Sequence, residues 1–297
     1  MKRIYIAGCG GMLGEAFYEV FRADFELKCS DIDLNAPWLS YLDIRDLAAY
    51  RQEVSAFRPD YLFHLGACTD LEACELDPGN AHLTNTLAVE HAAAIANELD
   101  IPLLYIGTAG IFDGRKRVYD ETDSPSPLGC YARSKYAGER HVRAHVRQHL
   151  VCRAGWMMGG GPAKDKKFVH KIMRQLREGR TELAIVNDKL GSPTYTRDFA
   201  RNVRALLETQ NWGLYNMVSS GTSSRIEVAA AILEFTGLKD RVRITEVPSA
   251  YFRDAYFAER PASECLLNSR LDRIGLNRMR DWRVALKEYI EDYCRRG

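Results

Sequence analysis

The chain has 297 residues, of which 46% are hydrophobic, enough to bury the core of one large domain or of two closely packed ones. Lysine and arginine total 41 against 40 aspartate and glutamate, so the net charge of +1 argues against a nucleic-acid partner. The apolar runs are too short to cross a membrane, and the N-terminus lacks the long apolar stretch of a signal peptide. We therefore expect a cytoplasmic protein with no membrane partner, and its eight cysteines, which form no C-x-x-C pair, are expected to be reduced.

The first half of the chain alternates strand-like and helix-like segments. Apolar runs predict strands over residues 3–7, 25–30, 61–66, 103–107 and 150–154. Helical spacing of apolar residues predicts helices over residues 12–21, 45–57, 80–99 and 129–149. This repetition predicts an α/β fold, a doubly wound parallel sheet of the Rossmann type with helices on both faces.

The alternation becomes irregular after about residue 155. Here the pattern predicts loops at 159–162 and 191–193, a strand at 183–186, and helices at 168–178, 198–209, 225–235 and 282–293. We expect residues 1–155, plus about 192–212, to form a dinucleotide-binding domain. A smaller mixed α/β substrate-binding lobe is expected from about 156–191 and 213–297.

A glycine-rich segment follows the first predicted strand and has the spacing G-x-x-G-x-x-G: Gly8-Cys9-Gly10-Gly11-Met12-Leu13-Gly14. In dinucleotide-binding loops one glycine permits the tight turn, another lets the pyrophosphate approach the backbone, and the last lets the helix pack closely on the strand. The helix N-terminus also offers free N–H groups to phosphates. Glycines form ordinary turns as well, but the strand before and the helix after favour cofactor contacts from Gly8, Gly10, Gly11, Met12, Leu13 and Gly14.

Asp31 ends the second predicted strand, at the distance from Gly8 where an acidic side chain can hydrogen-bond an adenosine ribose. A turn or a helix cap is the alternative role, and Asp33 is close enough to take its place. A carboxylate here opposes a 2′-phosphate, so the sequence favours NAD(H) over NADP(H), although nearby lysines and arginines could accept a phosphate. Asp43 and Ile44 follow the next strand-like stretch and are expected to contact the adenine.

A second constellation consists of Tyr131 and Lys135, one turn apart on a predicted helix, with Thr108 at the end of an upstream strand. A nearby ammonium is expected to lower the pKa of a tyrosine, which can then exchange a proton while a hydride moves to or from a cofactor. Thr108 can hydrogen-bond the reacting oxygen. A bare Y-x-x-x-K is a weak signal, and its position after the glycine motif makes it informative.

Together these motifs resemble those of extended short-chain dehydrogenases/reductases, and more closely those of the dTDP-4-dehydrorhamnose reductase family. The resemblance extends over nearly the whole chain. Its further markers are His64-Leu65-Gly66-Ala67, Thr69 to Glu75, Asn85, Ile111-Phe112-Asp113-Gly114, Arg153 with Trp156, Asn187 to Thr194, Gly213 to Asn216, Arg260-Pro261, Asn268-Ser269 and Leu271.

The resemblance implies an NAD(P)H-dependent reductase of a nucleotide-diphosphate 4-keto-6-deoxy sugar, acting as a monomer or homodimer. By this resemblance, Tyr131 would donate the proton, Lys135 would hold the cofactor ribose, and Thr108 would bind the keto oxygen of the substrate. The resemblance adds cofactor contacts at Leu65, Gly66, Ala67 and Asn85. It also implies substrate contacts at Thr69, Thr108, Ala109, Tyr131, Trp156, Phe168 and Arg260.

One segment departs from the family pattern. The family usually reads Ser-Thr-Asp-Tyr-Val-Phe where this chain reads Gly107-Thr108-Ala109-Gly110-Ile111-Phe112. A polar contact to the sugar is lost and space is opened, which favours a bulkier or differently substituted sugar nucleotide. Two alternatives stay open: a cofactor-binding regulatory protein of the type of the methionine adenosyltransferase beta subunit, and a sugar-nucleotide epimerase or dehydratase, for which no further acid/base pair is identified.

Three histidines, His141, His145 and His149, recur at every fourth position of one predicted helix. Two histidines at this spacing can bind zinc, but the arginines interleaved with them oppose a metal. The sequence therefore predicts no metal site.

Overall fold

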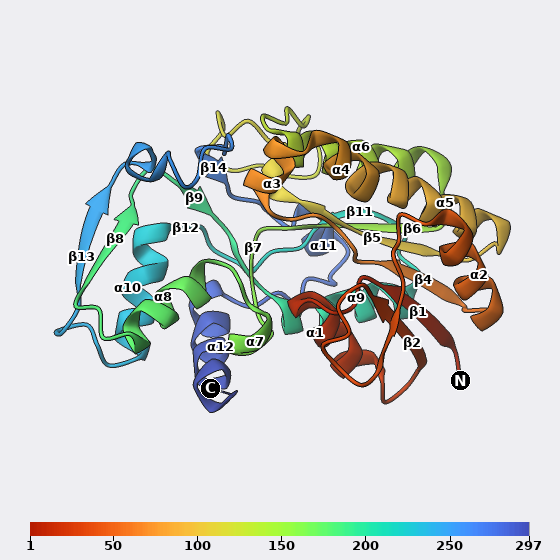
Figure 1. Ribbon diagram of the computed structural model, residues 1–297, viewed down its shortest axis with the longest axis horizontal. Helices are drawn as coiled ribbons and strands as arrows, with labels where there is room; N and C mark the ends of the chain where they lie inside the picture. The colour runs from red at the N-terminus through yellow and green to blue at the C-terminus, as the bar shows by residue number, and fades with distance from the viewer. Residues whose placement is uncertain (297) are drawn as a thin grey trace.

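The central feature of the computed structural model, which describes residues 1–296, is a parallel β-sheet flanked by helices (Figure 1). In this part of the chain the sheet has seven strands in the order β3-β2-β1-β4-β5-β6-β11, and all neighbours are parallel. The strands are β1 (Arg3–Ala7), β2 (Glu26–Asp31), β3 (Leu39–Tyr41), β4 (Tyr61–His64), β5 (Leu103–Thr108), β6 (His149–Ala154) and β11 (Gly213–Asn216). The doubly wound fold is confirmed, and its strand order reverses between β1 and β4, where such sheets bind ligands.

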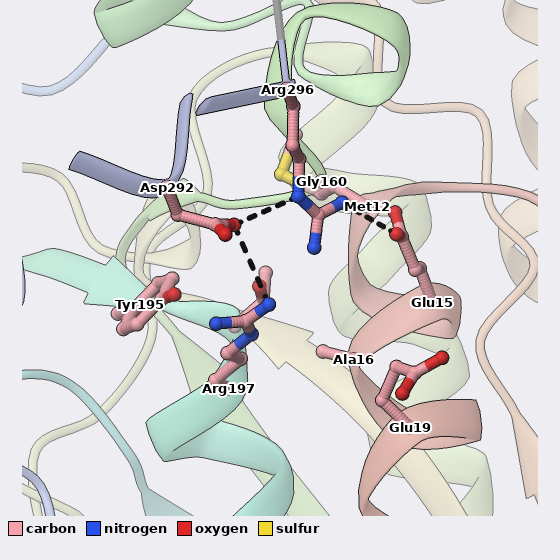
Figure 2. A pocket seen from close by; sticks show the side chains of 10 residues that line it. Met12, Glu15, Ala16, Glu19, Gly160, Tyr195, Arg197, Asp292 and Arg296 are labelled. Atoms are coloured by element: carbon pink, nitrogen blue, oxygen red, sulfur yellow. Dashed lines mark hydrogen bonds and ion pairs between the residues drawn. The ribbon is translucent and has the colours of Figure 1, made fainter. Parts of the chain in front are cut away.

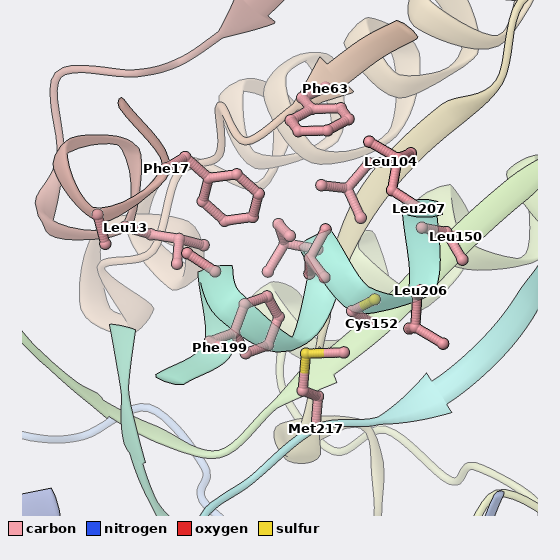
Figure 3. Packing of buried hydrophobic residues seen from close by; sticks show 14 of the residues in the cluster. Leu13, Phe17, Phe63, Leu104, Leu150, Cys152, Phe199, Leu206, Leu207 and Met217 are labelled. Carbon is pink, nitrogen blue, oxygen red and sulfur yellow. The ribbon is translucent and has the colours of Figure 1, made fainter. Parts of the chain in front are cut away.

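Helices cover both faces of the sheet. One face carries α1 (Met12–Phe21) and α9 (Thr196–Thr209), and the other carries α2 (Leu47–Phe57), α5 (Ala88–Glu98) and α6 (Cys130–His145). Helix α1 presents Leu13, Phe17 and Phe21 at every fourth position, and this spacing gives it an apolar face. Phe17 and Phe21 both pack edge-on against Phe63 of β4 with ring centroids 5.5 Å apart, as Figure 3 shows for Phe17. These contacts hold α1 against the face of the sheet at β1 and β4.

A smaller lobe lies beside the sheet, on the left in Figure 1. Its strands β8 (Glu182–Val186) and β13 (Arg243–Val247) pair in parallel, and α8 (Phe168–Arg177), α10 (Arg225–Phe235) and α12 (Trp282–Arg296) pack with them around one core. Short strands connect the two parts: β7 (Trp156–Met158) pairs with β10 (Pro193–Tyr195), and β9 (Leu190–Gly191) pairs with β12 (Ser223–Ser224) and β14 (Ser263–Glu264). The remaining helices are α3 (Leu71–Leu76), α4 (Pro78–His82), α7 (Gly161–Lys164) and α11 (Ser269–Arg273).

The structure corrects two predicted helices. The helix predicted over 80–99 consists of the end of α4, a π-helical turn over Leu83–Leu87, and α5. The helix predicted over 129–149 ends at His145, because the chain turns at Val146 into an extended conformation and joins the sheet at His149. His149 therefore does not share a helix face with His141 and His145.

The predicted division of the chain also needs correction. Residues 213–216, assigned to the lobe, form β11 of the central sheet, because Leu214 and Tyr215 point to opposite faces and join the two different cores. Strand β10 lies inside the predicted return to the sheet at 192–212, yet it pairs with β7 outside the central sheet. The return of the chain to the central sheet therefore consists of α9 and β11 and lies slightly later in the sequence than predicted.

The C-terminal helix α12 ties the lobe to α1. Arg296 Nη1 lies 2.6 Å from Glu15 Oε1, and Arg296 Nε lies 3.0 Å from Asp292 Oδ2 (Figure 2). Arg197 of α9 lies 3.5 Å from the same Asp292 carboxylate. A small pocket beside these ion pairs is also lined by Met12 at the start of α1. Within residues 1–296, no helix is both long enough and apolar enough to cross a membrane.

Candidate active site

The glycine-rich loop joins β1 to α1 and contains two glycines that the protein itself requires. Gly8 has a positive φ of 77°, and a Cβ atom placed on it would lie 2.2 Å from Gly66 Cα at the end of β4. A Cβ atom on Gly14 would lie 2.2 Å from the Cys9 carbonyl oxygen, so this glycine lets α1 pack against the loop. Leu13 is buried in the core, which leaves it only backbone atoms for a ligand.

Gly11 differs from these two. Its backbone conformation is accessible to any residue, and a Cβ atom placed on it would meet no atom of residues 1–296 within 4 Å other than those of Gly11 and its two chain neighbours. No internal contact explains a glycine at this position, which is exposed at the N-terminus of α1. The open space and the free N–H groups of the helix form a cradle that fits an anionic group such as a cofactor phosphate.

Asp31 lies next to this cradle. Its Oδ2 accepts a hydrogen bond from Gly10 N at 2.7 Å, and its Oδ1 accepts one from Asp33 N at 3.0 Å. The carboxylate therefore shapes the turn, as the alternative interpretation held, and it lies at the end of β2, from where the ribose contact stays a prediction. Both roles are compatible because each carboxylate oxygen has a further lone pair.

The two residues expected at the adenine have other contacts. Asp43 Oδ2 lies 2.6 Å from Arg45 Nη2, and hydrogen bonds from this guanidinium lower the pKa of Asp43. Ile44 is buried, and its Cδ1 packs against Gly66. Only the side chain of Asp43 is partly exposed, so it is the one of the pair that can reach a ligand.

The loop after β4 is held by Asn85. Leu65 N and Gly66 N both donate to Ala7 O, which fixes the loop beside β1 and leaves Leu65, Gly66 and Ala67 partly exposed. Asn85 is fully buried and forms two hydrogen bonds with Cys68 and a third, of 3.1 Å, with Ser134 Oγ of α6. Asn85 thus connects this loop to α6, and the cofactor contact expected of it stays a prediction.

Thr108 and Tyr131 come together where β5 ends and α6 begins, and Lys135 lies one turn further along α6. Burial raises the pKa of Tyr131 to about 12, the hydrogen bond with the Thr108 side chain opposes this shift, and the Glu264 carboxylate adds to it. The expected lowering of this pKa is therefore wrong: burial of the phenol dominates, and Lys135 is not among the groups that shift it. Lys135 is 4% exposed, its Nζ lies 4.3 Å from the Tyr105 ring centroid, and burial lowers its pKa to about 7.

Helix α6 is fixed at both ends of this constellation. Glu75 Oε1 accepts a hydrogen bond of 2.6 Å from Cys130 N at the first residue of the helix. Two turns after Tyr131, Glu139 forms a buried bidentate ion pair with Arg153 of β6, with distances of 3.0 Å to Nε and 2.6 Å to Nη2. These contacts fix the position of α6, and with it Tyr131, relative to the carboxyl ends of β5 and β6.

On the lobe side, the Arg225 side chain lies over the rings of both Trp156 and Phe168. The Arg225 guanidinium lies 3.5 Å from the Trp156 ring centroid and 4.6 Å from that of Phe168, and burial lowers its pKa to about 10. Trp156 Nε1 donates a hydrogen bond of 2.6 Å to Glu264 Oε2. The structure thus brings together two predicted substrate contacts with Arg225 and Glu264, which the sequence analysis missed.

The other predicted substrate contacts behave differently. Thr69 is exposed and accepts hydrogen bonds of 3.1 and 3.2 Å from Lys167 Nζ at the start of α8, so it bridges the sheet and the lobe. Arg260 forms an ion pair of 2.8 Å with Glu72, which neutralises it. Ala109 is 1% exposed and packs in a hydrophobic cluster, so its predicted contact with a substrate is not supported by its position.

The three histidines of the predicted series do not form one cluster in this structure, because His149 belongs to β6 and the other two to α6. The rings of His141 and His145 stack with centroids 4.2 Å apart, and His141 lies 3.7 Å from Glu90. In the described part of the chain, no group of three or more His, Cys, Asp or Glu side chains is arranged to hold a metal ion.

Comparison with known proteins gives relatives along nearly the whole chain. The dTDP-4-dehydrorhamnose reductase of Mycobacterium tuberculosis H37Rv is 33% identical over 291 residues, 96% of this chain and 91% of that protein. The spore coat polysaccharide biosynthesis protein SpsK of Bacillus subtilis is 30% identical over 293 residues, 98% of each chain. The crystal structure of the Bacillus anthracis dTDP-4-dehydrorhamnose reductase in complex with NADP has a TM-score of 0.90 at 28% identity, covering 98% of this chain and all of that one.

These relatives confirm the resemblance found in the sequence. Residues 1–295 match the RmlD substrate binding domain family, and the chain belongs to that family.

Proposed function

We propose that this protein is an NADH-dependent reductase of a nucleotide-diphosphate 4-keto-6-deoxy sugar, of the dTDP-4-dehydrorhamnose reductase type. The observation that carries the proposal is the constellation of Thr108, Tyr131 and Lys135 at the carboxyl end of β5. Strand β5 is next to the strand-order reversal at β4 and β1, where the Gly11 cradle lies. This arrangement suits a cofactor on one side of the reacting carbon and a proton donor on the other.

The side chains suit proton donation to a keto oxygen. A nicotinamide dinucleotide, when bound, supplies the hydride for the carbonyl carbon. A pKa of about 12 keeps the Tyr131 phenol protonated at neutral pH, so its proton can pass to the carbonyl oxygen as that oxygen becomes a hydroxyl. The Thr108 hydroxyl can hydrogen-bond the same oxygen. Lys135 lies one turn further along α6, and in its protonated form it can stabilise the phenolate that remains on Tyr131.

The protein's own groups fit a dinucleotide on the β1–α1 side. The Gly11 cradle can receive the pyrophosphate, and Lys164 Nζ is buried, with no hydrogen-bond partner within residues 1–296, and lies 5.2 Å from the Trp38 ring centroid. An ammonium in this position is available to a cofactor phosphate. Asp31 and Asp33 place negative charge where an adenosine 2′-phosphate would lie, which supports NADH. A higher kcat/KM with NADPH than with NADH would contradict this preference.

We assign the nucleotide end of the substrate to the lobe. Arg225 stacks on Trp156 and Phe168, and Lys167 stands at the start of α8 with its pKa lowered by burial. Two cations on the lobe side can attract a diphosphate, whereas Arg260 is already paired with Glu72. The lobe residues therefore suit the anionic end of the substrate, and Thr108 and Tyr131 suit its sugar.

The test follows NADH absorbance while the protein is mixed with a panel of nucleotide-linked 4-keto-6-deoxy sugars. Oxidation of NADH is expected with at least one of them. Tyr131→Phe is expected to lower kcat by about 100-fold or more while the Kd for NADH stays the same, because only the proton donor is removed. Tyr136→Phe on the same helix is the matched control. If NADH binds but no substrate is reduced, the regulatory alternative replaces this proposal.

A further inference from the structure

Glu264 places a carboxylate beside the reacting constellation, and no motif in the sequence marked it. It ends strand β14, whose parallel pairing with β9 brings residue 264 next to Gly191. Its Oε2 is held by Trp156 Nε1 at 2.6 Å. Its Oε1 lies 3.3 Å from the position of a Cβ atom on Gly110, and Thr108 Oγ1 lies 3.5 Å from the same position. The carboxylate therefore stands opposite Gly110, on the same side as Thr108.

The absence of a side chain on Gly110 is what leaves room for this carboxylate. The related family usually has tyrosine at this position and aspartate before it. A methyl group on Gly110 would approach Glu264 Oε1 to 3.3 Å and the Tyr131 ring to 3.9 Å, and a larger side chain would have to displace the carboxylate. Ala109 is buried in the hydrophobic cluster, so it offers no polar group in place of the lost aspartate. Glu264 is thus the acidic group next to Thr108 and Tyr131 on this side of the site.

We propose that Glu264 determines substrate specificity by accepting a hydrogen bond from a donor on the sugar carbon next to the reacting carbonyl. This inference rests on the proposed reductase function. In a 4-keto-6-deoxy sugar the carbonyl carbon has two ring neighbours, C3 and C5, and C5 carries the methyl group. The donor is therefore the substituent at C3, a hydroxyl or an ammonium group, since both donate to a carboxylate.

The physical reason is the cost of covering a carboxylate. Glu264 is half-buried, and its Oε2 is already bonded, so a substrate that closes the site removes water from Oε1. A donor at C3 replaces that water, whereas a 3-deoxy sugar leaves the oxygen without a partner. Sites built to bond a substrate hydroxyl reject analogues that lack it by large factors. Glu264 therefore favours 3-hydroxy or 3-amino sugars over 3-deoxy sugars.

The experiment measures kcat and KM for three nucleotide-linked 4-keto-6-deoxy sugars that carry hydroxyl, amino or no substituent at C3. In the wild type we expect kcat/KM for the 3-deoxy sugar to be at least about 100-fold below that of the better donor. Glu264→Ala is expected to reduce this ratio to less than about 10-fold, mainly by raising KM for the donor sugars. Glu264→Gln shows which donor the carboxylate binds. If the preference for the 3-amino sugar over the 3-deoxy sugar is lost, the donor is the ammonium group. If the preference for the 3-hydroxy sugar over the 3-deoxy sugar is preserved, the donor is the hydroxyl.

Controls keep the inference distinct from the reductase proposal. Glu291→Gln changes an exposed glutamate of α12 and is expected to leave all three substrates unaffected. Thermal unfolding and NADH affinity of the Glu264 variants report whether the fold and the cofactor site are intact. If the wild type reduces none of the sugars, the proposed function fails. If it reduces all three with similar kcat/KM, or if Glu264→Ala keeps the discrimination while remaining folded, the role of Glu264 is disproved and the reductase stands.

Discussion

The burial of Lys135 makes the stability of the cofactor-free protein depend on pH in a specific way. Burial lowers the pKa of Lys135 from 10.5 to about 7 in the folded protein. Between these values the unfolded chain binds a proton that the folded chain does not, so the free energy of unfolding rises with pH. The slope approaches about 1.4 kcal/mol per pH unit, which gives a gain of roughly 2 kcal/mol between pH 7 and pH 9.

Lys135→Met removes the titrating group and therefore this pH-dependent contribution. The measurement is reversible urea unfolding of the wild type and the variant, without cofactor, at pH 7, 8 and 9. We expect the stability of the wild type relative to the variant to increase by about 2 kcal/mol over this range. Lys239→Met, at an exposed position, is expected to leave the wild-type pH dependence unchanged. Parallel curves for the wild type and Lys135→Met would refute the argument that burial lowers the pKa of Lys135.

Three further predictions concern a loop, a thiol pair and a buried ion pair. Gly11→Ala should leave the melting temperature unchanged, because the new methyl group would meet no atom of residues 1–296 within 4 Å beyond its own chain neighbours. It should raise the Kd for NADH, measured by fluorescence titration, at least about tenfold. An unchanged Kd would show that the cofactor does not approach this glycine. The Cys74 thiol, with Sγ 3.6 Å from Cys68 Sγ, lowers the pKa of Cys68 to about 6. The rate at which iodoacetamide labels Cys68 should therefore rise with pH and reach its plateau before pH 7.5. Cys74→Ala should restore the pH dependence of an ordinary thiol. Glu139→Ala should cost about 3–5 kcal/mol in urea unfolding because it leaves Arg153 charged and unpaired, and Glu139→Leu combined with Arg153→Met should recover most of that loss; additive losses would contradict the ion-pair explanation.

Several features of this protein follow from local sequence. The helix that carries Leu13, Phe17 and Phe21 is recognisable because its apolar residues repeat at the helical period, and the strands of the sheet because each is a short apolar run bounded by turns. The glycine spacing and the one-turn separation of Tyr131 and Lys135 are equally local, since each depends only on the geometry of a single loop or helix. These local features were enough to predict the doubly wound fold and the group of Thr108, Tyr131 and Lys135 at the end of β5.

Other features depend on contacts between distant segments. Glu264 reaches the site because β14 pairs with β9, and Arg225 lies against Trp156 because α10 packs beside the same small sheet; no spacing in the sequence encodes either contact. Burial is also a tertiary property, which is why Ala109 lies in a hydrophobic cluster and why the pKa of Tyr131 is raised instead of lowered. Periodicity and spacing report the conformation of one segment, so the sequence by itself determined the fold and the reacting groups. Which side chains from remote segments surround those groups, and how much water they exclude, was decided only by tertiary packing.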